Sequence, residues 1–320
     1  MNILLTGGAG FIGSHLLAAL LNEERVSHLR LLDNFSTGYR KNLSRFLDHP
    51  KFECIEGDIT DYETCLQAMQ GIDLVSHQAA LGSVPRSIAD PVLTHATNIT
   101  GTLHIYTAAK EAGVKRIVYA ASSSTYGDSA SLPKIESVIG KPLSPYAVTK
   151  YVMELYADVF ARTYGIDFIG LRYFNVFGPQ QSPQGAYAAV IPLFMEAVLN
   201  NVAPVINGDG SYSRDFTYIE NVVDANIRAL FTDNAEALNQ VYNIAYGEST
   251  TLLQLFEMIC EIAGSDLQAQ FGPFRLGDIP HSLANIDKAK LHLQYQPVVS
   301  VKEGLRKAFT WYKENRNYFQ

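Results

Sequence analysis

The 320-residue sequence predicts an α/β fold: a doubly wound parallel sheet followed by a smaller mixed α/β unit. In the first half, short apolar runs alternate with longer segments of helical periodicity. The runs lack polar alternation, which is typical of strands buried on both faces. After about residue 175 this regularity fades, and neither a repeat nor a low-complexity linker follows. We therefore expect a dinucleotide-sized sheet domain over 1–175 and a cap over 176–320, with some cap segments returning to the sheet.

Each element is predicted from its own segment. Six apolar runs are expected to form strands: Ile3–Thr6, Leu29–Asp33, Phe52–Glu56, Leu74–His77, Arg116–Ala120 and Phe168–Tyr173. Segments of helix length separate them at 12–23, 61–69, 91–113 and 145–164. The second part is expected to contain a loop (178–188), a helix (191–200), a short strand (203–206), a glycine-rich turn (207–211) and helices near 251–263 and 301–315.

Composition limits the classes of partner. Lys and Arg number 25 and Asp and Glu 32, so the net charge is −7 and gives no general attraction to nucleic acid or to anionic membranes. An anionic ligand must be held by helix N-termini or single arginines. No apolar run is long enough to span a membrane, and the start of the chain reads as a strand rather than a signal peptide. We expect a cytoplasmic protein with reduced cysteines and no metal, because no metal-like spacing occurs among Cys54, Cys65, Cys260, His77, His95 and His281.

The segment Thr6–Gly13 directly follows the first predicted strand and places glycines at 7, 10 and 13. Such a turn lets a pyrophosphate approach the N-terminus of the next helix, as in the Rossmann fold. The second strand ends in Asp33, 20 residues after Gly13, where a carboxylate can accept hydrogen bonds from a ribose diol. Its charge, and the lack of Lys or Arg over 34–38, favour NAD over NADP. Asp58 is expected either to meet the adenine amine or to act as a turn residue.

A second pattern is Ser144-Pro145-Tyr146, followed four residues after the tyrosine by Lys150. Ser144 is a good helix cap and Pro145 a good first residue, so the Tyr146 and Lys150 side chains share one helical face. A nearby ammonium favours the phenolate and would lower the pKa of Tyr146. This tyrosine could then act as a general base on an alcohol. Three serines, 122–124, end the fifth predicted strand, where at least one is expected to be catalytic.

These residues resemble the extended short-chain dehydrogenase/reductase family, and specifically its nucleotide-sugar epimerases. The resemblance covers essentially the whole chain and is greatest to bacterial UDP-N-acetylglucosamine 4-epimerases of polysaccharide synthesis. Besides the glycine turn and Tyr146-to-Lys150 pair, it rests on segments 33–38, 77–80, 80–88, 98–102, 120–128, 171–179 and 214–216. It implies that the NAD contacts are Gly7, Gly10, Phe11, Ile12, Gly13, Asp33, Asn34, Ser36, Thr37, Gly38, Asp58, Ile59, Gln78, Ala79, Ala80, Asn98, Tyr146, Lys150 and Tyr173.

The resemblance also implies a mechanism. Tyr146 removes the proton from the sugar O4 while C4 gives a hydride to NAD, Lys150 lowers the pKa of Tyr146, and Ser122 holds O4. The 4-keto sugar then rotates about its pyrophosphate linkage, and the hydride returns to its opposite face. Related 4,6-dehydratases carry an Asp-Glu pair after the catalytic residue. Here Ser123 and Ser124 stand in those places, which disfavours dehydration.

By the same resemblance, the cap binds the UDP-sugar. Arg214 and Arg275 are expected to clamp the diphosphate, and Asp278 to meet the uridine ribose. Simple UDP-galactose 4-epimerases carry a tyrosine where this chain has Ser282, so an N-acetyl group should fit beside the sugar C2. The complete set of expected substrate contacts is Gly82, Ser83, Ser122, Ser123, Ser124, Tyr146, Asn175, Ala189, Val190, Asn207, Arg214, Arg275, Asp278 and Ser282.

Several alternatives remain open at this stage. The substrate could be a UDP-N-acetylhexosaminuronic acid, whose carboxylate would meet Ser83, Arg86 or another group, or the enzyme could accept UDP-glucose and UDP-galactose broadly. A net dehydrogenase and a non-catalytic NAD-binding scaffold are the alternatives from other classes. The resemblance implies a homodimer formed through the helices at 91–113 and 145–164. Their apolar stripes alone could equally face the sheet.

Overall fold

The computed structural model describes residues 1–184, 188–274 and 279–319. Its central element is a seven-stranded sheet in the order β11-β6-β5-β4-β1-β2-β3, and every pair in it is parallel. The strands are β1 (Asn2–Thr6), β2 (His28–Asp33), β3 (Phe52–Glu56), β4 (Leu74–His77), β5 (Arg116–Ser122), β6 (Asp167–Tyr173) and β11 (Gln240–Ile244). The predicted doubly wound sheet is confirmed. Its order reverses between β1 and β4, and ligands bind at the carboxyl ends of strands at such a point.

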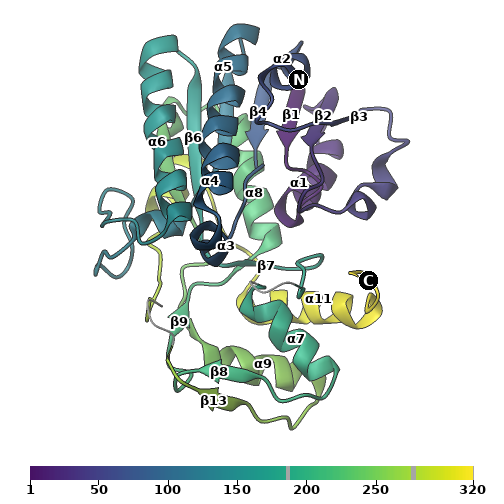
Figure 1. Ribbon diagram of the computed structural model, residues 1–320, viewed down its shortest axis with the longest axis vertical. Helices are drawn as coiled ribbons and strands as arrows, with labels where there is room; N and C mark the ends of the chain where they lie inside the picture. Colours follow the sequence, from purple (N-terminus) through teal and green to yellow (C-terminus); the bar gives the residue numbers. More distant parts are fainter. Residues whose placement is uncertain (185–187, 275–278, 320) are drawn as a thin grey trace.

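Helices cover both faces of this sheet (Figure 1). One layer contains α2 (Tyr62–Met69), α5 (Thr102–Ala112) and α6 (Pro145–Tyr164); the other contains α1 (Phe11–Leu21) and α8 (Ile219–Phe231). Successive strand side chains point to opposite faces. Leu4 therefore packs in the core under α2, α5 and α6, whereas Leu5 packs in the core under α1 and α8.

The cap lies below the carboxyl ends of the strands in Figure 1. It is built from helices and short two-stranded sheets that pair β7 with β10, β9 with β12, and β8 with β13. Its elements are β7 (Val176–Phe177), α7 (Val190–Leu199), β8 (Val205–Asn207), β9 (Ser213–Arg214), β10 (Thr217–Tyr218), β12 (Thr250–Thr251), α9 (Leu252–Ala263), β13 (Gln270–Gly272) and α11 (Val301–Glu314). The helix α10 (Asp287–Leu293) packs against β11 and α8.

Two segments from the second half belong to the sheet domain. Helix α8 packs beside α1, and strand β11 pairs with β6 at the edge of the sheet. The sequence did not identify either segment as an element. The described residues 178–184 and 188 have no regular structure, and the strand expected at 203–206 lies at Val205–Asn207.

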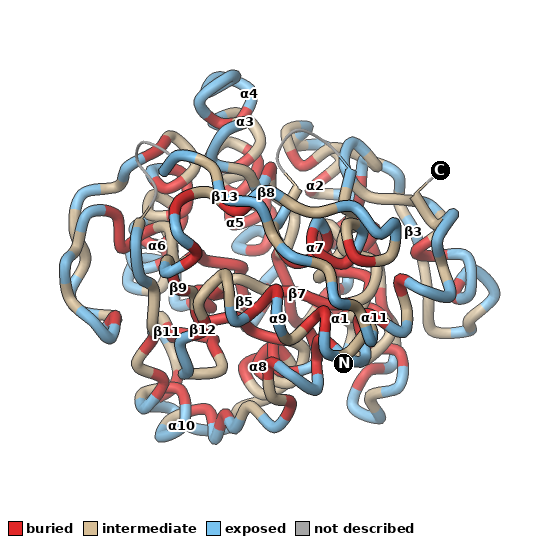
Figure 2. The backbone as a smooth tube through the Cα atoms, turned by 90° about the horizontal axis from the view of Figure 1, so that it is seen from below, coloured by how far each residue is buried: buried red, intermediate tan, exposed pale blue. Residues whose placement is uncertain are grey.

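The segment predicted as a helix over 91–113 is helical from 91 to 112 but contains a π-helical turn. It consists of α4 (Pro91–His95), a π-helical turn (Ala96–Gly101) and α5, and a short helix α3 (Val84–Ala89) precedes it. Figure 2 shows α3 and α4 at the surface as largely exposed segments, while buried residues concentrate around the sheet. π-Helical turns of this kind are often found at functional sites.

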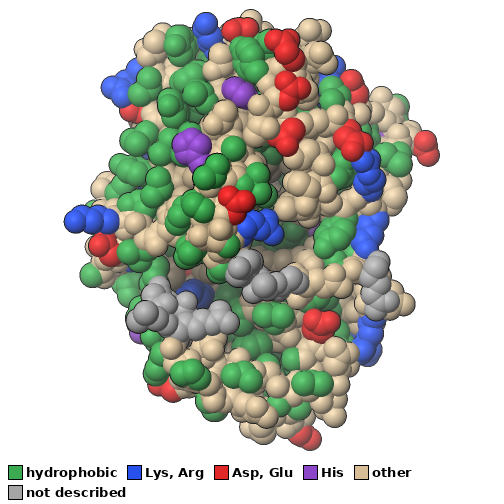
Figure 3. Space-filling view, viewed as in Figure 1, with side chains coloured by type: hydrophobic (Ala, Val, Ile, Leu, Met, Phe, Trp, Pro, Cys, Tyr) green, Lys and Arg blue, Asp and Glu red, His purple; other side chains and the backbone are tan. Residues whose placement is uncertain are grey.

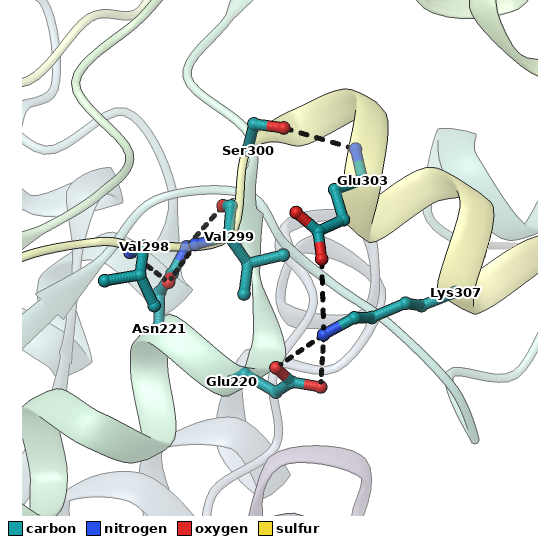
Figure 4. A network of polar contacts seen from close by, with 7 residues as sticks. All are labelled: Glu220, Asn221, Val298, Val299, Ser300, Glu303 and Lys307. Carbon is teal, nitrogen blue, oxygen red and sulfur yellow. Dashed lines mark hydrogen bonds and ion pairs between the residues drawn. The ribbon is translucent and has the colours of Figure 1, made fainter.

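Helix α11 is fixed to α8 by polar contacts (Figure 4). The Asn221 side chain is 1% exposed; its amide donates to Val299 O at 2.8 Å, and its oxygen accepts from the N–H groups of Val298 and Val299, both at 3.1 Å. The exposed Lys307–Glu220 pair at 2.9 Å adds little, because solvent screens it. The buried asparagine therefore holds the segment just before α11 against α8.

Candidate functional site

The glycine turn follows β1 and leads directly into α1. A Cβ at Gly7 would lie 2.7 Å from the backbone of Ala79, and one at Gly13 would lie 2.2 Å from Gly7 O, so neither position admits a side chain. Gly10 precedes α1, and no side chain caps this helix. The first-turn residues line a cavity, and their N–H groups have no partner within the helix. This turn therefore fits a pyrophosphate.

Asp33 lies at the end of β2 and lines the same cavity. Its carboxylate accepts from Ala9 N and Phe35 N, both at 2.8 Å, and burial raises its pKa. Asn34 also lines the cavity, and its amide donates to Asp58 Oδ2 at 2.7 Å. Asp58 itself does not line this cavity, but its hydrogen-bond partner Asn34 does.

The three predicted catalytic side chains converge on this cavity from two elements. Ser122 ends β5, whereas Tyr146 and Lys150 lie on the first turns of α6. As predicted, Ser144 caps α6, with its Oγ accepting from Ala147 N at 3.1 Å. The N–H of Tyr146 donates to Ser87 Oγ at 3.0 Å. These contacts fix the start of the helix relative to the cavity.

The electrostatics of this group differ from the prediction in one respect. Burial raises the pKa of Tyr146, and a hydrogen bond with Ser122 offsets part of that rise. The expected lowering of the Tyr146 pKa by Lys150 is therefore wrong for the protein alone. The Lys150 ammonium lies 5.9 Å from the tyrosine ring centroid and instead donates to Ala120 O at 2.7 Å. Burial lowers the pKa of Lys150 to about 8.

Ser122 is polarised by its neighbour. Its Oγ accepts from both the N–H of Ser124 at 3.1 Å and the hydroxyl of Ser124 at 2.9 Å. Both bonds use its lone pairs, so its single hydrogen serves the Tyr146 contact in the protein alone and can pass to another acceptor. Ser122 can therefore donate to a reacting oxygen in the cavity.

The cavity brings together most of the residues predicted for the cofactor. Figure 3 shows a hollow across the middle of the molecule, where the sheet domain meets the cap. The predicted residues that line the cavity are Gly7, Gly10, Phe11, Ile12, Gly13, Asp33, Asn34, Ser36, Thr37, Gly38, Ile59, Gln78, Ala79, Ala80, Gly82, Ser122, Tyr146, Lys150, Tyr173 and Asn175. Asn98 is fully buried and does not line it; its side-chain amide bonds Leu81 and Thr149 instead.

The predicted substrate residues of the cap lie on several short elements. Arg214 is in β9, and its guanidinium donates to Ser213 O and Pro280 O. Ser282 lies beside it, because its N–H donates to Ser213 O at 3.0 Å. Three more predicted positions lie in the cap: Ala189 and Val190 at the start of α7 and Asn207 at the end of β8. Ser83 lies in the sheet domain instead, as the N-terminal capping residue of helix α3. Arg275 and Asp278 fall outside the residues that the structure describes.

Three residues near the site are buried and polar: the sequence predicts His77 to be structural or pocket-lining, and it assigns no role to Asp215 or Asn226. Asn226 on α8 bonds the Tyr173 hydroxyl at 2.9 Å. Asp215 is fully buried and accepts from the N–H groups of Tyr246, Gly247 and Ala284, all at 3.1 Å, which joins three cap segments next to Arg214. His77, at the end of β4, bonds two threonines. The sequence signal for His77 and Asp215 is their place in segments 77–80 and 214–216, whereas Asn226 is only an amide residue in a largely apolar stretch.

The chain was compared with known proteins. The model of the family described as "NAD dependent epimerase/dehydratase family" matches residues 3–245. A Methanocaldococcus jannaschii protein named putative UDP-glucose 4-epimerase is 36% identical over 315 residues, covering 98% of this chain and 99% of that protein.

Two solved structures are similar along their whole length. The UDP-glucose 4-epimerase of Thermotoga maritima, with UDP-glucose, has a TM-score of 0.92 at 36% identity and covers 99% of this chain and 100% of its own. The UDP-N-acetylglucosamine 4-epimerase of Methanobrevibacter ruminantium, in complex with UDP-N-acetylmuramic acid, has a TM-score of 0.92 at 39% identity and covers 98% of both chains. The chain therefore belongs to the NAD-dependent epimerase/dehydratase family, and its cofactor is NAD.

Proposed function

We propose that this protein is a UDP-sugar 4-epimerase whose preferred reaction interconverts UDP-N-acetylglucosamine and UDP-N-acetylgalactosamine. One observation carries the chemistry: Ser122, Tyr146 and Lys150 line the same cavity as the glycine turn and Asp33. A substrate alcohol held in this cavity can lose its proton to Tyr146, beside the residues that would bind the dinucleotide. Relatives with UDP-sugar 4-epimerase names support the substrate class.

In the proposed mechanism, the Tyr146 phenolate oxygen takes the proton of the sugar O4 while the C4–H bond breaks. NAD held by the glycine turn and Asp33 would supply a reversible hydride acceptor for C4 and a positive charge in the cavity. This charge and the Lys150 ammonium would oppose the effect of burial on the Tyr146 pKa. Ser122 donates to O4, and Tyr146 returns the proton when C4 is reduced again, so no net oxidation results.

Dehydration is disfavoured by the residues that follow Ser122. Ser123 and Ser124 carry hydroxyl groups, which are too weakly acidic to protonate a leaving hydroxide. The Ser124 hydroxyl is also engaged with Ser122. The chain therefore offers no acid at the positions where the related dehydratases carry their Asp-Glu pair.

The acetylated substrate is proposed from the side-chain volume at Ser282 and from the hydroxyl groups of two other predicted substrate residues. A serine there leaves room that a tyrosine would fill, and the hydroxyls of Ser83 and Ser123 could bond an acetamido group. Arg214, and in this proposal Arg275, would hold the diphosphate, because an acidic protein needs local guanidinium groups for an anion. Asp278 would take the uridine ribose.

The test is to incubate purified protein, without added NAD, with UDP-N-acetylglucosamine or UDP-glucose and to quantify products by proton NMR. Faster conversion of the acetylated sugar supports the proposal, and Ser282→Tyr should reverse the preference while keeping C4 chemistry. Preference for UDP-glucose would refute the pocket argument. Conversion of only UDP-N-acetylhexosaminuronic acids would favour that alternative. Dependence on added NAD with net NADH formation would indicate a dehydrogenase, and no conversion at all a scaffold.

A cytoplasmic homodimer is part of the proposal. No helix in the described part of the chain is long and apolar enough to cross a membrane. Apolar side chains are exposed on neighbouring helices, with Ile88 on α3 63% exposed, Val92 on α4 77% and Leu155 on α6 49%. Such a patch is typical of an interface between copies. Light scattering on the native protein and on Leu155→Glu would test it, with the variant expected as a monomer.

A further inference from the structure

His77 is a buried histidine that the proposed mechanism does not use. It ends β4 and is 1% exposed. Its Nδ1 lies 2.7 Å from the hydroxyl oxygen of Thr6, and its Nε2 lies 3.0 Å from that of Thr102. Thr6 is the last residue before the glycine turn, and Thr102 is the first residue of α5. The imidazole therefore bridges the cofactor turn and the helix layer behind the site.

The hydrogen bonds of the two threonines fix the direction of this bridge. The Thr102 hydroxyl has one hydrogen and donates it to Asn98 O at 2.7 Å. It must therefore accept at the His77 contact, which requires a hydrogen on Nε2. Nδ1 of a neutral ring is then bare and accepts from Thr6. The Thr6 oxygen in turn accepts from the N–H of Ala79 at 3.2 Å.

The chain of bonds continues from Asn98 to the catalytic helix. The Asn98 amide donates to the Thr149 hydroxyl at 3.1 Å, and Thr149 donates to the backbone oxygen of Tyr146 at 2.8 Å. Thr6, Asn98, Thr102 and Thr149 are each at most 2% exposed. Leaving such a buried group without a partner is costly, so this series of hydrogen bonds strongly favours a single arrangement.

We propose that His77, as the neutral Nε2–H tautomer, is a positioning residue that sets the dinucleotide turn in register with the helix carrying Tyr146 and Lys150. The turn that would hold the hydride acceptor and the side chain that accepts the proton lie on separate parts of the chain, so their relative placement has to be enforced. A displacement of about 1 Å in such a geometry can cost on the order of 100-fold in rate. Loss of the bridge should therefore lower kcat and leave KM for the nucleotide sugar nearly unchanged.

The surroundings of His77 agree with a permanently neutral ring. Burial, with a smaller contribution from the Lys150 charge, lowers the pKa of His77 to about 3. The other groups facing it are the Thr6 and Thr102 hydroxyls and the Tyr106 ring, whose centroid lies 6.3 Å from that of the imidazole. None of these three carries a charge at neutral pH.

The first test is NMR of the NAD-loaded protein with 15N-labelled histidine, using loss of the signal in His77→Gln for assignment. We expect the Nε2–H tautomer, unchanged between pH 6 and 9. An Nδ1–H tautomer, or titration in this range, would overturn the proposal. This measurement needs no turnover, so it stands apart from the proposed substrate and reaction.

The second test uses a matched pair at Thr102. Thr102→Val removes the hydroxyl at nearly constant volume, whereas Thr102→Ser keeps it. With whichever UDP-sugar the native protein converts, we expect Thr102→Val to lower kcat about 3- to 30-fold. The kcat of Thr102→Ser should stay within about twofold of the native value, and both variants should keep the native KM and NAD content. Equal losses in both variants, or an effect on KM or NAD content alone, would mean that the bridge does not position the reacting groups. If Thr102→Val does not fold, the tautomer measurement decides.

Discussion

The ammonium of Lys150 donates a hydrogen bond to the backbone oxygen of Ala120, with 2.7 Å between Nζ and O. Ala120 lies in β5, two residues before Ser122, so this bond ties the catalytic helix to the strand that carries the serine. Lys150 is 3% exposed, and burial lowers its pKa to about 8. The protein thus keeps a buried cation at neutral pH, which is a cost to stability at a site needed for chemistry.

Lys150→Met should make the protein more stable and nearly inactive. Moving the lysine pKa from 10.5 to about 8 corresponds to a cost of about 3 kcal/mol at pH 7. The substitution also removes the bond to Ala120, which costs about 1 kcal/mol of stability. We therefore expect the free energy of unfolding to rise by about 1–2 kcal/mol, on the order of the difference between the two effects. Urea unfolding at pH 7 checks the sign, and product assays should show at least a ~100-fold loss of rate.

The pH dependence provides the control for this prediction. Between pH 8 and 10.5 the unfolded chain binds more protons at Lys150 than the folded chain does, so native stability from this group rises with pH. The advantage of Lys150→Met should therefore shrink over that range. An advantage that stays constant with pH would show that packing, not charge burial, causes it.

Tyr146→Phe should remove catalysis and leave the cofactor in place. The phenyl ring keeps the packing but has no oxygen to exchange the proton, and general acid–base groups contribute about 100- to 10,000-fold. We expect a loss of kcat in that range with native NAD content, measured from the absorbance of cofactor released by denaturation. Tyr151→Phe on the same helix is the matched control and should stay active. A Tyr146→Phe variant with native rate would remove the tyrosine from the mechanism.

The sheet could be predicted closely from the sequence because its strands are buried on both faces. Such strands lack polar alternation, and β4, with all four residues buried, has the predicted bounds Leu74–His77. The edge strand β3 also has its predicted bounds, Phe52–Glu56, although none of its residues is fully buried. The helix predicted over 91–113 contains a π-helical turn that includes Asn98, whose side chain bonds Leu81 and Thr149. No local pattern indicates a partner 51 residues away. Strand β11 was missed for a related reason, since only its pairing with β6 identifies it.

The residues of the candidate site also fall into two groups: those that a local sequence pattern predicts and those that only the structure identifies. Residues in local motifs, such as Gly10 and Tyr146, were predicted because the spacing itself carries the chemistry. His77 and Asn226 act through Thr6 and Tyr173, which lie 71 and 53 residues away in sequence. Sequence periodicity reports which face a residue takes, and a buried polar partner depends on the three-dimensional packing. These positions therefore needed the structure.

Glu154→Gln should destabilise the sheet domain strongly. Glu154 on α6 forms a buried ion pair with Arg172 on β6 at 2.7 Å, and their side chains are 6% and 4% exposed. Removing one partner leaves a buried charge, which costs about 3–5 kcal/mol. Asp158→Asn, which breaks the exposed pair with Arg162 on the same helix, should change stability by less than about 0.5 kcal/mol. Similar melting temperatures for the two variants would contradict this prediction.

Tyr318→Phe should weaken retention of NAD. The Tyr318 hydroxyl donates to Asn42 Oδ1, and the Asn42 amide donates to Ala9 O at 2.7 Å inside the glycine turn. Ala9 N in turn donates to Asp33 Oδ2, so the end of the chain supports both the pyrophosphate and ribose positions. A lost hydrogen bond of this half-buried kind is worth about 1 kcal/mol, so we expect roughly a fivefold faster release of NAD with little change in kcat at saturating cofactor.

The release rate can be measured by trapping free NAD with an auxiliary dehydrogenase after dilution. Tyr164→Phe is the matched control, because Tyr164 is 49% exposed at the end of α6 and away from the turn. Equal release from Tyr318→Phe and the native protein would mean that Asn42 holds the turn without the terminal tyrosine. Asn42→Ala, which removes the bond to Ala9 directly, should then release NAD faster than either.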